Sequence, residues 1–168
     1  MEPPNRKSNR LSTHDYSSVG SYFITICVKE RKQILSEIIC DRENKTKIKL
    51  LSYGVVAEKY INRLNEFYDE VCVDEYIIMP DHIHLLITVL SGQSRTPVPT
   101  GSELMRDNRN SVIARFVGTF KRFCNKEYGE NVWQSRYYDH VIRNQEDYNE
   151  KSEYIKNNAY KWQNKNMV

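Results

Sequence analysis

The chain has 168 residues, 39% hydrophobic and 28% charged, with a formal net charge of +3 at pH 7. This length suits one domain with a proper core and argues against two. No apolar run approaches the ~18 residues that a membrane span needs, and the charged start of the chain lacks the apolar segment of a secretory signal. The mildly basic balance permits a nucleic-acid partner without requiring one.

The four cysteines, Cys27, Cys40, Cys72 and Cys124, are far apart in the chain. They form no C-x-x-C pair, which excludes the usual spacings of zinc ribbons and fingers. We interpret them as free thiols in a reducing compartment and expect no disulfide framework. The chain is therefore expected to be cytoplasmic.

Residues 1–20 are polar and contain turn formers, which indicates an extended arm ahead of a single domain at 21–168. The arm is basic because Arg6, Lys7 and Arg10 cluster in it.

Residues 22–28 are β-branched and aromatic and lie between a glycine and a charged run, which predicts a first, central strand. The signal from 33 to 49 is weak and indicates a short hairpin or a loop around 41–44. Apolar residues then recur at helical spacing, which predicts an amphipathic helix over 50–67.

Two apolar runs, 72–79 and 82–90, are joined by a Pro-Asp turn and should pair as a hairpin. The second run begins with His82 and His84. Successive strand residues point to opposite faces, so both imidazoles should project from one face. Such a pair is suited to binding a metal, although two histidines on a strand can also be solvent-facing or hydrogen-bonded without one.

Residues 91–110 contain glycines and prolines with no apolar period, which predicts a loop. A strong apolar period predicts a second helix over 111–126, whose other face carries Arg115, Lys121 and Arg122. A basic face of this kind is either solvated or in contact with nucleic acid, and the pattern does not separate the two.

Alternation predicts a strand over 136–143, and Asn144 is a suitable N-cap for a third helix over 145–157. The order of elements favours an α+β fold, an antiparallel sheet with helices on one face, related to the ferredoxin-like fold. Tyr154 and Asn158 are four residues apart on the third helix and share a face. From residue type alone, the commoner role of Tyr154 is a core tyrosine with its hydroxyl at the surface.

Several blocks of sequence, taken together and in this order, closely resemble the single-tyrosine HUH transposases, and among them the REP-associated tyrosine transposases. The blocks are DYS at 15–17 with YFIT at 22–25, MPDHIHLL at 79–86, WQ at 133–134 with YYDHVIR at 137–143, and EYIKNN at 153–158 with Trp162. The resemblance extends from about residue 5 to residue 162. One departure is Ala159, which stands where relatives often have proline after the Asn-Asn pair.

The resemblance implies an HUH endonuclease domain that cuts single-stranded DNA. By position, His82 and His84 are the metal-binding pair, Tyr154 is the nucleophile that forms a 5′-phosphotyrosine, and Asn158 takes the place of a polar metal ligand. This donor set suits Mg²⁺ or Mn²⁺. His140 is a further ligand, an orienting partner of a ligand, or a packed side chain, and the last two are favoured.

The resemblance also implies strand transfer, and substrates that are single strands carrying hairpins or palindromic repeats. Contact with this DNA is expected from the basic residues of the arm and of the second helix, namely Arg6, Lys7, Arg10, Arg115, Lys121 and Arg122. The protein would then be associated with the nucleoid, as a monomer or a homodimer, with no membrane partner. Two other functions stay open: a domesticated DNA-binding protein that no longer transposes, and a metal phosphoesterase without a covalent step.

Overall fold

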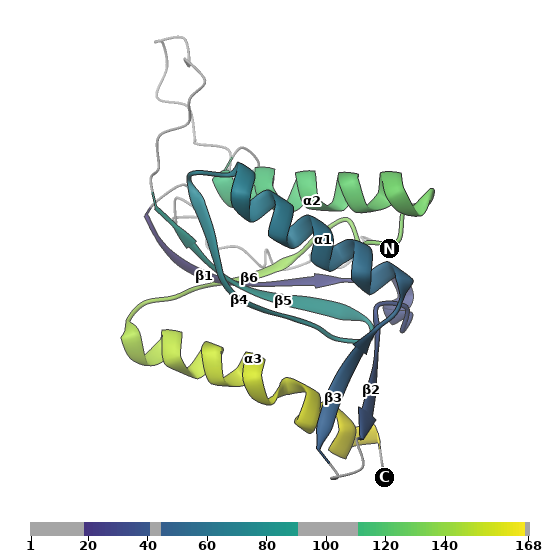
Figure 1. Ribbon diagram of the computed structural model, residues 1–168. Helices are drawn as coiled ribbons and strands as arrows, with labels where there is room; N and C mark the ends of the chain where they lie inside the picture. The colour runs from purple at the N-terminus through teal and green to yellow at the C-terminus, as the bar shows by residue number, and fades with distance from the viewer. Residues whose placement is uncertain (1–18, 41–44, 91–110, 167–168) are drawn as a thin grey trace, which may run out of the picture.

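A four-stranded antiparallel sheet organises the chain in the computed structural model, which describes residues 19–40, 45–90 and 111–166 (Figure 1). The strands lie in the order β4 (Val71–Ile78), β5 (His82–Val89), β1 (Gly20–Cys27) and β6 (Tyr138–Val141). The predicted α+β class, the β4–β5 hairpin and the central place of the first strand are confirmed. The basic arm and the predicted loop at 91–110 lie outside the described residues, apart from the last two residues of the arm.

Three helices accompany this sheet: α1 (Ser52–Phe67), α2 (Val112–Tyr128) and α3 (Gln145–Asn166). The order β1, α1, β4, β5, α2, β6 is the β-α-β-β-α-β pattern of a ferredoxin-like fold. A separate hairpin of β2 (Ser36–Cys40) and β3 (Thr46–Leu50) is inserted before α1. The weak sequence signal in this segment had predicted either a hairpin or a loop. The helix α3 follows as an addition.

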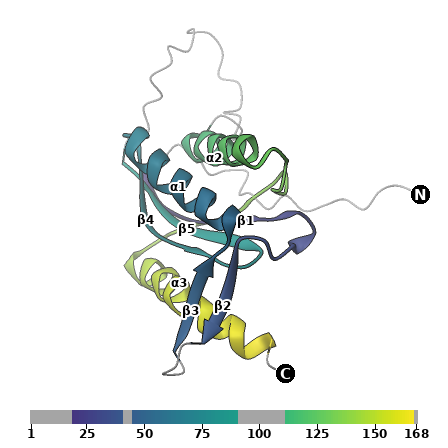
Figure 2. The same ribbon diagram turned by 45° about the vertical axis from the view of Figure 1, so that its right-hand side comes forward.

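The helices do not share one face of the sheet, so that part of the sequence prediction was wrong. Helices α1 and α2 cover one face, and α3 crosses the other (Figures 1 and 2). The physical reason lies in β5, in which every residue except Thr88 is buried. One face of β5 carries Ile83, Leu85, Ile87 and Val89 and the other carries His82, His84 and Leu86. Side chains that are buried on both faces of a strand need a cover on both faces, and α3 supplies the second cover.

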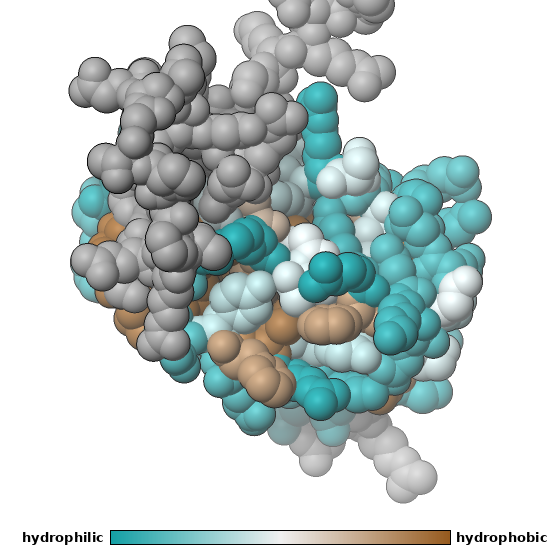
Figure 3. Space-filling view, turned by 90° about the horizontal axis from the view of Figure 1, so that it is seen from above, coloured by the Kyte–Doolittle hydropathy of each residue, from teal (hydrophilic) through white to brown (hydrophobic). Residues whose placement is uncertain are grey.

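Alternation along β1 separates the two layers. Tyr22, Ile24 and Ile26 are buried in the core beneath α1 and α2. Phe23 points the other way and contacts Tyr154 of α3. On the outer side of α1 and α2, hydrophilic side chains cover most of the described surface in view, as amphipathic helices require (Figure 3).

Helix α3 is longer than the sequence pattern indicated, since it continues to residue 166 rather than ending near 157. Ala159 explains the extension. A proline at this position would remove a backbone N–H and disfavour the helix, whereas alanine is the best helix former. The extra turns carry Lys161 and Trp162 beside the histidine pair.

None of the helices in the described part of the chain combines the length and apolar character that crossing a bilayer requires.

Replacing Gly54 with alanine is expected to lower the free energy of unfolding by about 3 kcal/mol, because overpacking forces the backbone apart. A Cβ at this position of α1 would lie 2.0 Å from the carbonyl oxygen of Leu35. Gly118 of α2 is the matched control, since a Cβ there meets no atom within 4 Å. Gly118→Ala should stabilise by ~0.5–1 kcal/mol through helix propensity. Urea denaturation measures both, and equal effects would contradict the close approach at Gly54.

Candidate active site

His82 and His84 project from the same face of β5 toward α3. Both are buried, and their Nε2 atoms lie 3.0 Å apart. His84 contacts the ring of Tyr154, and His82 contacts the ring of Trp162, so α3 forms the other wall of the site. The shared face follows from the two-residue repeat of the strand, as the sequence predicted.

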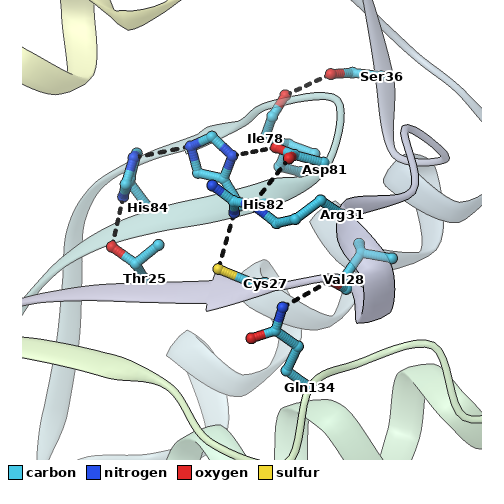
Figure 4. A network of polar contacts seen from close by, with 10 residues as sticks. All are labelled: Thr25, Cys27, Val28, Arg31, Ser36, Ile78, Asp81, His82, His84 and Gln134. Atoms are coloured by element: carbon cyan, nitrogen blue, oxygen red, sulfur yellow. Dashed lines mark hydrogen bonds and ion pairs between the residues drawn. The ribbon is translucent and has the colours of Figure 1, made fainter. Parts of the chain in front are cut away.

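Each imidazole is held through its Nδ1 atom (Figure 4). Asp81 Oδ1 lies 2.5 Å from His82 Nδ1, and since a carboxylate only accepts, Nδ1–H donates and Nε2 keeps its lone pair. Thr25 Oγ1 lies 2.8 Å from His84 Nδ1, across the β1–β5 pairing that places these two residues opposite each other. Partners of this kind fix ring orientation around protein-bound metals.

Burial, with a smaller contribution from the neighbouring His82, lowers the pKa of His84 to about 3. The ring is therefore neutral throughout the physiological range. A metal ligand must be neutral imidazole, so this environment suits metal binding.

Tyr154 of α3 lies directly over this pair. Its ring centroid is 5.3 Å from that of His84 and 5.9 Å from that of Phe23, both in edge contacts. The residue is 39% exposed, which leaves it open to solvent rather than closed in the core. One chain therefore brings this tyrosine to its own histidines.

Asn158 follows one turn later on α3 and is only 6% exposed. Its side-chain nitrogen is buried with no hydrogen-bond partner among the described residues. A buried amide without a partner is rare, and at this position it faces the same cavity as the histidines. The side-chain oxygen and nitrogen of an amide are assigned from such contacts, so either atom can meet a ligand here.

The cavity has a volume of about 820 Å³. His82, His84, Tyr154 and Asn158 line it together with two cations, Arg31 and Lys161. The structure thus brings together the four residues that the sequence singled out for catalysis and metal binding.

The donor set fits an open metal site. Neighbouring ligands of an octahedral ion with bonds of ~2.1 Å lie ~3.0 Å apart, which is the separation of the two Nε2 atoms. Within residues 19–40, 45–90 and 111–166, no three His, Cys, Asp or Glu side chains form a group that could hold a metal. The Asn158 amide lines the same cavity and is a residue that could supply a third protein donor.

The sequence profile of the family described as "Transposase IS200 like" matches residues 17–158. The chain belongs to this family. A transposase is an enzyme that acts on DNA, so membership gives the chain a transposase role.

Individual relatives agree with this assignment. A REP-associated tyrosine transposase of Escherichia coli (strain K12) is 24% identical over 147 residues, covering 87% of this chain and 70% of that protein. An uncharacterized protein of Haemophilus influenzae (strain ATCC 51907 / DSM 11121 / KW20 / Rd) is 30% identical over 167 residues, covering 94% of this chain and 90% of the relative. The expected resemblance to REP-associated tyrosine transposases is confirmed.

The fold has a solved counterpart. A structure described as a REP-associated tyrosine transposase bound to a REP hairpin matches 96% of this chain and 74% of its own. The two share 20% sequence identity and superpose with a TM-score of 0.57. This likeness shows a common fold.

In this IS200-like transposase, His140 lies apart from the histidine pair. Its Nε2 atom is 2.9 and 3.0 Å from the two carboxylate oxygens of Asp147, in the first turn of α3. The contact joins β6 to the start of α3, and His140 does not line the cavity.

The cations predicted to contact DNA from α2 lie on the helix layer opposite α3. Arg115 pairs with Glu70 at 3.1 Å, and the guanidinium of Arg122 lies 5.4 Å from the centre of the Phe123 ring. The ammonium of Lys121 lies 2.8 to 3.4 Å from three backbone carbonyls of residues 134–136. Contact with DNA from these three side chains stays a prediction, and Arg6, Lys7 and Arg10 lie outside the described residues.

Sequence reasoning missed four residues of the site, for two different reasons. Asp81 precedes His82 in the sequence, and an acidic residue next to a candidate metal ligand can indicate a hydrogen-bond partner of that ligand. The Pro-Asp pair was interpreted only as a turn. Thr25 and Arg31 reach the site through strand register and a turn, and Lys161 through the length of α3, and no local pattern marks any of them.

Proposed function

We propose that this IS200-like transposase is a metal-dependent endonuclease and strand transferase for single-stranded DNA that acts through a 5′-phosphotyrosine. The observation that carries the proposal is the contact between the Tyr154 and His84 rings in one cavity. A nucleophile and a pair of metal ligands are the two halves that this reaction needs. Their meeting within one chain also favours a monomer as sufficient for cleavage.

His82, His84 and Asn158 would hold a Mg²⁺ or Mn²⁺ ion, which supplies Lewis-acid polarisation of the scissile phosphate and offsets charge on its oxygens. Imidazole nitrogen is a better match for Mn²⁺ than for Mg²⁺. Asp81 and Thr25 hold the two rings through their Nδ1 atoms, so the Nε2 atoms, 3.0 Å apart, are the nitrogens that would bind the ion.

Tyr154 Oη attacks the phosphorus of one phosphodiester and loses its proton to water in the cavity. The new bond joins Oη to phosphorus, and the bond from phosphorus to the 3′-oxygen breaks. That oxygen leaves with a proton as a free 3′-hydroxyl. Because the phosphate stays in an ester bond to Tyr154, attack by another 3′-hydroxyl rejoins the strand without ATP.

The proposed substrate is a single strand that carries a hairpin. The REP-associated relative of known structure is described as bound to a REP hairpin. The cavity beside Tyr154 has a volume of about 820 Å³ and is lined by Arg31 and Lys161, two cations that suit a phosphate backbone. The basic arm would add phosphate contacts, which raise the affinity for DNA without distinguishing between base sequences.

The proposed reaction predicts a covalent adduct on one defined side of the cut. Hairpin strands from the flanks of the gene, labelled at the 5′ or the 3′ end, are incubated with the protein and Mn²⁺ and run on a denaturing gel. The 3′-labelled fragment should migrate with the protein, and the 5′-labelled fragment should be free and extendable by a polymerase. EDTA should prevent both. No adduct with any flanking strand, or an adduct on the 5′-labelled side, would overturn the proposal.

A further inference from the structure

The turn that follows β1 has an unusual backbone. This turn, η1 (Lys29–Arg31), contains two consecutive non-glycine residues in the left-handed region, with φ of 56° at both Glu30 and Arg31. Such residues are strained and persist only where the surroundings hold them, and they concentrate at functional sites. Here the surroundings do hold them, because Val28 N–H donates to the Asp81 carbonyl at 2.9 Å and Lys29 N–H donates to that of Val132 at 2.8 Å.

The turn directs the Arg31 side chain toward the histidines (Figure 4). Its Nε lies 3.2 Å from Asp81 Oδ2, and its Nη1 donates to Cys27 Sγ at 3.0 Å. The other oxygen of Asp81 accepts from His82. Arg31, Asp81 and His82 therefore form one continuous chain of contacts, with Asp81 buried in the middle.

The contacts with Asp81 and Cys27 do not use all the hydrogen-bond donors of the Arg31 guanidinium. The group has five N–H donors, and the side chain is 52% exposed where it lines the cavity. The contact with Asp81 uses one of these donors and the contact with Cys27 uses another. The remaining N–H groups are available to a ligand in the cavity.

We propose that Arg31 binds a phosphodiester of the DNA strand in this cavity and, through Asp81, positions His82. The inference rests on the proposed function. A guanidinium matches phosphate oxygens with two parallel hydrogen bonds, and one already fixed on two sides loses little freedom when it binds. Lys161, the other cation among the described residues that line the cavity, has its Nζ 5.5 Å from the centre of the Tyr154 ring. Arg31 is thus the cation at the His82 end of the cavity.

Binding without cleavage tests the phosphate contact. In a Tyr154→Phe background with EDTA, affinity for an unstructured oligothymidylate is measured over a series of salt concentrations. Arg31→Gln should weaken binding about tenfold at low salt and reduce the slope of log K against log salt by ~0.7, the value for one phosphate on a single strand. Lys32→Gln is the matched control, because it removes one positive charge at the next residue, whose exposed side chain does not line the cavity. It should leave the slope of log K against log salt unchanged.

Cleavage tests the positioning role and separates this inference from the proposed function. Arg31→Lys keeps the charge and the salt slope, but a single ammonium cannot hold Asp81 and phosphate together, so kcat should fall about tenfold. If wild type forms the adduct while Arg31→Gln keeps both the wild-type salt slope and the wild-type kcat/KM, the inference is overturned and the proposed function stands. A fall in kcat with an unchanged slope in Arg31→Gln would overturn the phosphate contact. Absence of a wild-type adduct counts against the proposed function. In that case the difference in salt slope between wild type and Arg31→Gln still tests whether Arg31 contacts a phosphate.

Discussion

Tyr154→Phe is expected to abolish the protein–DNA adduct and to lower cleavage by more than ~10⁴-fold, the scale for loss of a covalent nucleophile. The substitution removes only the hydroxyl. The edge contacts of the ring with His84 and Phe23 remain, so the fold and the affinity for a single strand should be unchanged. Denaturing gels measure the adduct, and a filter-binding titration measures the affinity.

Tyr160 is the matched control for this prediction. It lies on the same helix, is 61% exposed and does not line the cavity. Tyr160→Phe should therefore form the adduct at the wild-type rate. Full cleavage by Tyr154→Phe without an adduct would instead favour a metal phosphoesterase with no covalent step. DNA binding by wild type with no cleavage at all would favour a domesticated DNA-binding protein.

His82→Ala and His84→Ala are each expected to lower cleavage by at least ~100-fold, since both supply nitrogen donors to the same proposed ion. Binding of Mn²⁺, followed by titration calorimetry, should weaken in both variants. Affinity for single-stranded DNA should be largely retained, because phosphate contacts elsewhere supply much of it.

The chain offers His140→Ala as a control for the loss of a histidine. His140 bonds to Asp147 at the start of α3 and lies outside the cavity, so its replacement should leave Mn²⁺ affinity near the wild-type value. Equal losses of Mn²⁺ affinity in His140→Ala and His82→Ala would show that the ion is held elsewhere than at the histidine pair.

Much of the site was predictable because it depends on local geometry. The two-residue repeat of a strand places His82 and His84 on one face wherever that strand lies. The helical repeat likewise places Tyr154 and Asn158 on one side of α3. The β-branched run at 22–28 and the Pro-Asp turn between two apolar runs were sufficient to predict β1 and the β4–β5 hairpin. In each case the information lies within a few residues.

The sequence by itself therefore determined the strands of the main sheet, the approximate places of the three helices and the two pairs of residues that share a face. It left the segment of β2 and β3 as a hairpin or a loop, and it ended α3 too early. Only the tertiary structure decided that α3 covers the sheet face opposite α1 and α2, which brings Tyr154 to His84. It also placed Thr25 against His84, His140 against Asp147, and Arg31 against Asp81. The reason is physical: a periodic pattern states which residues share a side of an element, whereas the layer that covers that side depends on contacts between residues far apart in the chain.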